Sequence, residues 1–207
     1  MLGGKTRRNC AGAQTAIAER GARMTIRFGA GRFATLVAGV VLIQVAREAA
    51  AADFDPEAFF AGQSYSAGAI DATFAKPEPF TALIKGTVSN GVLSMEETYS
   101  FADAQRAQRW SLRPVGNGAY VGTVQTETGD GVLHEPRPVT GQVSPSGGTL
   151  TYDGYAPNGK SVLLHFRHVM TMQPNGTIRT RVAVSKLGLP MGKADAVIAK
   201  RPEDLPK

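Results

Sequence analysis

Cysteine is nearly absent from this chain of 207 residues, whose single cysteine is Cys10. Residues 53–207 contain none, so they can form no disulfide, no thiolate nucleophile and no cysteine metal site. The apolar segment near the N-terminus is not followed by a cysteine, so we expect no lipid anchor on an N-terminal cysteine. This composition suits an oxidising compartment.

Motifs for catalysis and cofactor binding are also scarce. The sequence contains no Gly-x-Ser-x-Gly elbow and no glycine-rich phosphate loop. Among the three histidines, His165 and His168 would point to opposite faces of one strand, and His134 falls in a loop. A zinc site needs three or four ligands that converge. The sequence therefore predicts no metal, no cofactor and no catalytic residue.

The positive charge of the chain is concentrated near its N-terminus. The formal net charge is +6, but residues 1–52 hold eight Lys and Arg against two acidic residues. Residues 53–207 retain 15 basic and 15 acidic residues (23 less 8, and 17 less 2) and are formally neutral. A neutral body lacks the basic surface that binds a phosphate backbone. We expect no nucleic-acid partner.

The N-terminal segment has the order of a secretory signal peptide. Arg27 and Arg32 precede an apolar run at 33–46, and four alanines follow at 49–52. The run is shorter than the roughly 20 residues of a transmembrane helix.

We therefore predict a signal peptide at 24–52, with cleavage after Ala52 and translation starting at Met24. Residues 1–23 would precede the true start. The mature protein would be periplasmic or secreted, and an uncleaved anchor helix is the alternative.

The remaining chain, 53–207, reads as a single β domain. Turn sequences such as Asn90-Gly91 and Pro174-Asn175-Gly176 recur about every 8 to 15 residues. Between the turns apolar and polar residues alternate, which places each set on one side of a sheet. The strands expected are 63–74, 80–88, 91–101, 106–113, 118–126, 138–144, 148–155, 160–172 and 177–186, with a tenth at 193–200.

We predict an all-β fold, an antiparallel up-and-down barrel of lipocalin or calycin type with about eight to ten strands. A sandwich is the alternative, but closure removes exposed strand edges. One short helix is expected at 55–60, where Asp55 could cap the helix and Pro56 is its first residue. Segment 127–138 is expected to be a loop, and 201–207 a frayed tail.

One turn allows a prediction of register. A three-residue turn at 174–176 would pair Gln173 with Thr177. The inward residues of the two strands then pair as Met172 with Ile178, Met170 with Thr180, His168 with Val182 and Phe166 with Val184. Apolar side chains would face mostly apolar ones, whereas a slip of one residue would set Met170 against Arg181.

Glu97 is the most informative candidate residue because it interrupts an apolar face. A buried carboxylate must be neutralised or paired. A four-residue turn at 102–105 would place Trp110 opposite Glu97 and Arg109 beside it, and a bulge would bring Arg109 opposite. The interpretations are a polar contact for a ligand head group, a structural Glu–Arg pair, or a solvated strand end.

Other residues could complete a ligand pocket. Trp110, Tyr120, Tyr152 and Phe166 have the spacing of inward residues, although aromatics at such spacing are more often plain core. His168 shares the inward face of its strand. The candidate ligand-binding residues are therefore Glu97, Arg109, Trp110, Tyr120, Phe166 and His168.

A basic stripe is expected on the outer face. Arg179 and Arg181 lie on one side of their strand, and Arg167 lies on the outward side of the preceding one. The stripe could contact anionic lipid head groups as a peripheral membrane contact, or it could be an ordinary solvated face.

Several short motifs occur in an order that resembles a known family. They are Phe60-Ala61-Gly62, Glu97 with Phe101 and Asp103, Arg109-Trp110, Tyr120-Val121-Gly122, and Ser185-Lys186-Leu187-Gly188 with Gly192. Together they resemble the domain of unknown function 3833 family of bacterial envelope proteins, often lipoproteins. The resemblance implies a calycin-like barrel and an envelope address, and no established activity.

Two features depart from that family. The lipid-attachment cysteine is missing. Where the family tends to have paired aspartates before Trp-Met, this sequence reads Arg167-His168-Val169-Met170. A carboxylate-based role of that stretch would not carry over.

Three functions stay open. The first is an exported protein that binds a lipid or small apolar ligand inside the barrel. The second is a structural or interaction module of the envelope with a filled barrel. The third, an enzyme acting on lipids, would need Glu97, Arg109 and His168 to converge around a pocket. The sequence leaves the ligand and the oligomeric state open.

Overall fold

The computed structural model describes residues 53–73 and 75–206, which fall in one compact unit, Ala46–Lys207. The predicted signal peptide, its cleavage after Ala52 and the start at Met24 concern residues outside this described part. No helix within the described ranges is long and apolar enough to cross a membrane.

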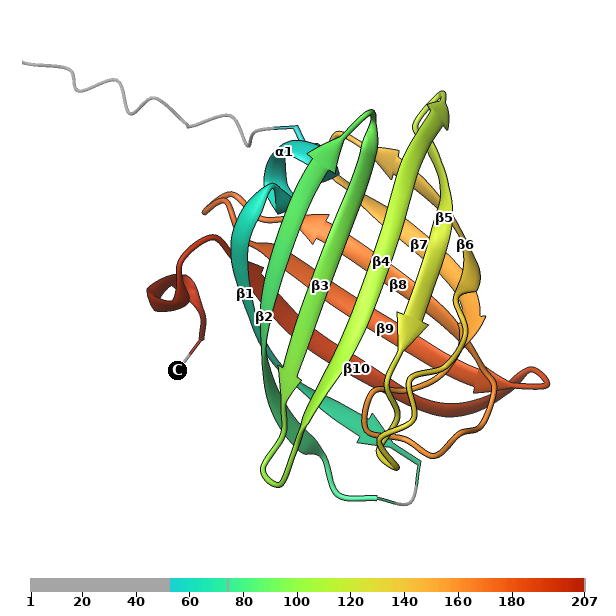
Figure 1. The fold of residues 1–207 in the computed structure, drawn as a ribbon. Helices are drawn as coiled ribbons and strands as arrows, with labels where there is room; N and C mark the ends of the chain where they lie inside the picture. Colours follow the sequence, from blue (N-terminus) through green and yellow to red (C-terminus); the bar gives the residue numbers. More distant parts are fainter. Residues whose placement is uncertain (1–52, 74, 207) are drawn as a thin grey trace, which may run out of the picture. The chain divides into compact units, whose positions relative to one another are not determined.

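Ten antiparallel strands form a closed barrel in the described part of the chain (Figure 1). Each strand pairs with its sequence neighbours, and the first and last strands pair to close the sheet. The strands are β1 (Gly62–Ala72), β2 (Glu78–Ser89), β3 (Val92–Ser100), β4 (Gln105–Gly116), β5 (Ala119–Thr126), β6 (Arg137–Ser144), β7 (Gly147–Gly154), β8 (Leu164–Met172), β9 (Ile178–Lys186) and β10 (Leu189–Ala199). The prediction of an all-β up-and-down barrel is confirmed.

The hairpin between β8 and β9 has the predicted register. Met172 pairs with Ile178, Met170 with Thr180, His168 with Val182 and Phe166 with Val184. The turn closes through the backbone N–H of Gln173, which donates to the Thr177 carbonyl at 2.8 Å. Turn chemistry and the alternating pattern therefore agree on one pairing.

Most strands begin within two residues of their predicted starts, but two begin four residues away. β8 starts at Leu164 instead of position 160, because 155–163 form a loop. β10 starts at Leu189 instead of 193, since Leu187 and Gly188 both have positive φ angles, 51° and 79°. A two-residue turn of this kind matches the twist of the two strands, so β9 and β10 stay paired up to the turn.

The predicted helix is present as α1 (Pro56–Phe60). Asp55 caps it, because its Oδ1 accepts hydrogen bonds from the backbone N–H groups of Glu57 and Ala58 at 2.9 and 3.2 Å. Proline at the first helical position has no N–H to leave unsatisfied. The N-cap and proline signals were therefore sufficient to predict this short helix.

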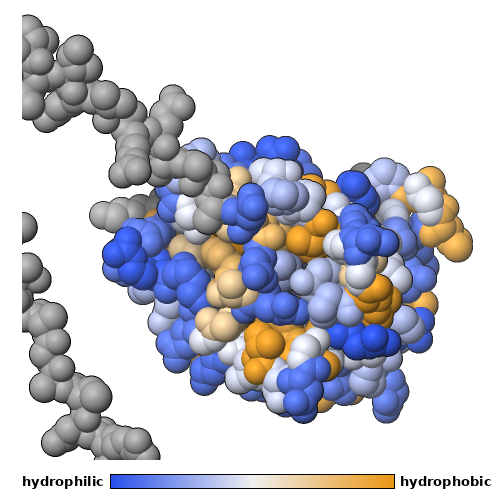
Figure 2. All heavy atoms as spheres, turned by 90° about the horizontal axis from the view of Figure 1, so that it is seen from above, coloured by the Kyte–Doolittle hydropathy of each residue, from blue (hydrophilic) through white to orange (hydrophobic). Residues whose placement is uncertain are grey.

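Helix α1 covers one end of the barrel (Figure 1). Phe54 and Phe60 are buried in the main core. Lys200, just after β10, donates to the carbonyls of Phe59 and Ala61 at 2.9 Å each, and so ties the end of the helix to the sheet. Viewed from above, small hydrophobic areas alternate with hydrophilic ones on the surface at this end (Figure 2).

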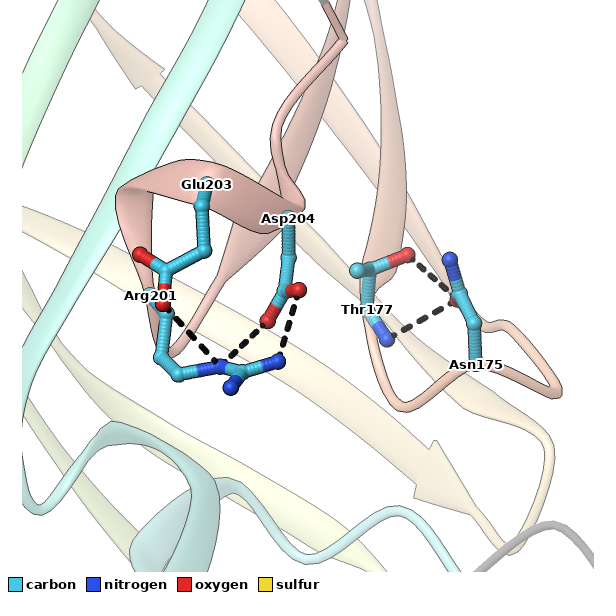
Figure 3. A network of polar contacts seen from close by, with 5 residues as sticks. All are labelled: Asn175, Thr177, Arg201, Glu203 and Asp204. Atoms are coloured by element: carbon cyan, nitrogen blue, oxygen red, sulfur yellow. Dashed lines mark hydrogen bonds and ion pairs between the residues drawn. The ribbon is translucent and has the colours of Figure 1, made fainter.

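The C-terminal segment is ordered, and the prediction of a frayed tail at 201–207 is wrong for the described residues up to 206. It forms a 3-10 turn, η1 (Pro202–Asp204). Arg201 binds the carboxylate of Asp204 at 2.8 and 2.9 Å, and that of Glu203 at 3.7 Å (Figure 3). Ion pairs between neighbouring residues accompany this turn, and their exposure limits what each contributes to stability.

Candidate functional site

The barrel encloses a cavity of about 140 Å³. It extends from Phe60 of α1 to Ala156 and Pro157, in the loop between β7 and β8. The cavity is also bordered by Lys193 of β10, whose side chain is 65% exposed and pairs with Asp71 on the outer face of the sheet. Most of its lining consists of apolar and aromatic side chains, as is usual for small-molecule pockets.

Glu97 is the acidic side chain of this cavity among the described residues. Its Oε2 accepts two hydrogen bonds, from the Tyr99 hydroxyl at 2.9 Å and from the Trp110 indole N–H at 3.0 Å. Strand periodicity explains the arrangement, since Glu97 and Tyr99 are two residues apart on β3 and share its inward face. Both bonds go to one oxygen, and Oε1 forms no hydrogen bond with the described residues.

Burial raises the pKa of Glu97, and the hydrogen bonds from Trp110 and Tyr99 oppose that rise. Glu97 is half-buried by solvent accessibility, but the remaining accessible surface belongs to a side chain that lines the cavity. Desolvation by the surrounding barrel therefore governs its titration.

The hydrogen-bonded side chains around Glu97 continue through two further buried residues, Gln108 and Thr126. The Gln108 side-chain carbonyl lies 3.4 Å from the Tyr99 hydroxyl, and its amide donates to the Thr126 hydroxyl at 2.8 Å. Gln108 is 1% exposed and Thr126 is 2% exposed, so the chain of contacts is inside the barrel. A buried polar group that is hydrogen-bonded costs little and fixes the side chains that it joins.

Aromatic side chains from β4, β7 and β8 form another part of the cavity lining. Tyr152 stacks on Phe166 with ring centroids 4.9 Å apart and meets Trp110 edge-on at 5.4 Å. Its hydroxyl lies 3.1 Å from Nε2 of His168. Burial lowers the pKa of His168 to about 4, so the imidazole is neutral at pH 7.

Five of the six candidate ligand-binding residues line the cavity: Glu97, Trp110, Tyr120, Phe166 and His168. Arg109 does not, and of the three interpretations of Glu97 the interior pair with Arg109 is wrong. Arg109 is on the outer face, where it pairs with Glu96 at 3.4 Å and both side chains are about half exposed.

The reason lies in the turn between β3 and β4. The loop is 101–104 instead of 102–105, so Gln108 pairs with Glu97, and Trp110 pairs with Met95. A shift of two residues keeps every side chain on its face, so Trp110 still points inward. The trio of Glu97, Arg109 and His168 that an enzyme would need is therefore not assembled.

Sequence reasoning missed Tyr99, Gln108 and Thr126. Tyr99 and Gln108 carried a usable signal, because each is two residues from an inward candidate, Glu97 or Trp110 respectively. Thr126 had none, since a small hydroxyl at a strand end looks like any surface residue.

A second polar cluster lies in the loops 127–136 and 155–163. Nε2 of His134 is 3.0 Å from the Ser161 hydroxyl, which donates to Asp130 at 2.9 Å, and Asp130 also binds Thr128. In a serine triad the acid orients the histidine, whereas here it binds the serine. The cluster joins the loop 127–136 to the loop 155–163 and is not arranged for nucleophilic catalysis.

The third histidine, His165, and the basic stripe are on the outside. His165 contacts Asp153 at 2.8 Å, and the described residues contain no group of three metal-ligating side chains. Arg179 and Arg181 both bind Asp195 of β10, at 3.3 and 3.1 Å, which offsets part of their charge.

Comparison with known proteins adds one finding. The profile of a family described as "Protein of unknown function (DUF3833)" matches residues 35–200, a range that includes the cavity residues Glu97, Trp110 and His168. No curated protein matches the chain.

Proposed function

We propose that this chain, which belongs to the family Protein of unknown function (DUF3833), is an exported envelope protein that binds a small apolar ligand inside its barrel. Family membership supplies no activity, so the proposal is based on the cavity. The observation that carries it is the mainly apolar cavity in which Oε1 of Glu97 has no hydrogen-bond partner among the described residues. Such a combination of apolar lining and one orienting group is typical of ligand sites.

The size of the cavity limits the ligand. An apolar cavity of about 150 Å³ in another protein holds benzene. The present 140 Å³ therefore suits a molecule of similar size, or the end of a longer chain. This size narrows the expected ligand from a whole lipid to a small apolar molecule or one end of a lipid.

Binding can be tested with the tryptophan of the cavity. The chain contains a single tryptophan, Trp110, so its fluorescence reports on the cavity alone. We expect toluene or cyclohexanol to shift this emission saturably and to raise the midpoint of thermal unfolding, because a ligand bound only to the folded state stabilises it. Native mass spectrometry of protein purified from a periplasmic extract should show a co-purifying small molecule.

Two variants distinguish binding in the cavity from binding on the surface. Val182→Phe enlarges a side chain that lines the cavity and should reduce probe binding, whereas Val115→Phe adds the same ring at an exposed position and should leave probe binding unchanged. If neither probe shifts Trp110 emission or the unfolding midpoint in the unmodified protein, ligand binding is contradicted. The packed barrel with an interaction surface would then be the better account.

That alternative has its own support in the hairpin between β9 and β10. Leu187, Leu189 and Met191 are 95%, 67% and 41% exposed at its tip, beside Lys186. Exposed apolar side chains that gather in one place mark interaction sites more often than isolated ones do.

The export step gives a separate prediction. Cleavage after Ala52 would produce a mature N-terminus that reads Asp-Phe-Asp-Pro, directly before α1. Intact mass and N-terminal sequencing of the protein from its native host should find this end. A mass that includes residues 24–52 would contradict cleavage.

A further inference from the structure

We propose that the ligand carries a protonated amino group, which binds Oε1 of Glu97 within a partly aromatic cage. This inference rests on the proposed function, because it names the ligand class for the same cavity. It begins from the hydrogen bonds of Glu97, both of which end on Oε2. Oε1 is left as an acceptor in the lining of the cavity, where a ligand with an N–H donor can reach it.

The charges around Glu97 favour a cation. The titratable side chains that line the cavity with it are Tyr99 of β3, Tyr120 of β5, Tyr152 of β7, His168 of β8 and Lys193 of β10. The tyrosines and the neutral imidazole supply no positive charge at pH 7. The Lys193 side chain is on the outer face, where it pairs with Asp71 at 3.3 Å. A ligand ammonium would therefore supply the counter-charge that a buried carboxylate needs.

The aromatic side chains fit the same ligand. Trp110 and Tyr99 bind the carboxylate directly, and Tyr152 packs edge-on against Trp110. Aromatic faces attract organic cations, and the attraction increases when water is excluded. A carboxylate held among tryptophan and tyrosine rings is thus suited to a small amine with an apolar substituent.

The same arrangement disfavours anions. A fatty acid or other carboxylate would bring a second negative charge beside Glu97 with no described basic side chain in the middle of the cavity. Like charges at close range oppose binding strongly in a medium of low dielectric constant. The cavity should therefore distinguish molecules of one size by the charge of their head group.

Three probes of matched size test this distinction: cyclohexylamine, cyclohexanol and cyclohexanecarboxylate. At pH 7 we expect the amine to bind at least about tenfold more tightly than the alcohol, as a hydrogen bond to a charged group predicts. The carboxylate should not compete. Affinities are measured from Trp110 emission and by isothermal titration calorimetry on the purified protein.

The Glu97→Gln variant is the direct control, because it removes the charge and keeps the shape. Its amine affinity should fall to that of the alcohol, while its alcohol affinity stays within about threefold of the unmodified protein. An amine preference that survives in Glu97→Gln would overturn the inference. So would equal binding of amine and alcohol to the unmodified protein, a result that leaves the proposed function standing.

If Glu97→Gln does not fold, the pH dependence of amine binding to the unmodified protein tests the same inference. Lowering the pH should weaken amine binding as Glu97 takes up a proton, and should affect cyclohexanol less. His168, whose pKa burial lowers to about 4, stays mostly neutral down to pH 5, so it does not account for a loss of amine binding above that pH. Amine binding that does not weaken would contradict the role of Glu97, and no binding of any probe would contradict the proposed function itself.

Discussion

Replacing Gly86 with alanine should lower the free energy of unfolding by about 3 kcal/mol or more, since large losses follow when a buried phenylalanine leaves its site. Gly86 lies on the inner face of β2, directly beneath α1. A Cβ atom there would lie 2.0 Å from the carbonyl oxygen of Phe60 and 2.9 Å from its carbonyl carbon. Neither backbone atom can move aside without displacing the helix, so Phe60, which is 5% exposed, would lose its packing in the core.

The loss is measured by urea unfolding followed through Trp110 emission. Thr87→Ala is the matched control, because Thr87 is the next residue of β2 and is exposed on the outer face. It should change the unfolding free energy by less than about 0.5 kcal/mol. A Gly86→Ala variant with the midpoint of the unmodified protein would show that α1 does not close the barrel as described.

Acid should destabilise the protein through His168 by about 3 kcal/mol between pH 7 and 4. Burial lowers the pKa of this imidazole from 6.5 to about 4. As the pH falls below 6.5 the unfolded chain binds the proton first, so stability is lost until the folded state is also protonated near pH 4. Each pH unit between the two pKa values corresponds to about 1.4 kcal/mol, which gives the stated size.

The His168→Gln variant isolates this contribution. It can keep a hydrogen bond to Tyr152 but does not titrate, so its stability relative to the unmodified protein should improve by about 3 kcal/mol from pH 7 to 4. Glu97 acts in the opposite direction, because its raised pKa favours the folded state at lower pH in both proteins. His165→Gln, on the outer face, should leave the loss through His168 in place. A constant difference between His168→Gln and the unmodified protein would refute the burial of a neutral His168.

The β8–β9 and β3–β4 hairpins show where the sequence predicts the register of two strands and where it does not. In the β8–β9 hairpin the Pro174-Asn175-Gly176 turn and the alternating pattern allow one register, and the structure has it. In the β3–β4 hairpin the turn has no such signal. A displacement by two residues keeps the same faces inward, so periodicity alone cannot choose between the alternatives.

That displacement decides what Glu97 contacts. The pairing of Glu96 with Arg109 on the outer face is compatible with solvated charges, whereas an arginine in the cavity would have to lose its hydration. Glu97 instead receives hydrogen bonds from Tyr99 and Trp110. The sequence predicted the interior carboxylate and placed Trp110 near it, but it left open a pair with Arg109 that the structure does not contain.

The amino-acid sequence by itself determined the all-β class, the inward and outward faces, the capped helix and five of the cavity residues. Each follows from local rules: the period of two, the turn residues and the N-cap. Only the tertiary structure decided that the barrel closes, that α1 covers one end, and that Glu97, Gln108 and His168 share one cavity. Those outcomes depend on pairings between distant strands, and on the cost of burying a charge, which no short stretch of sequence encodes.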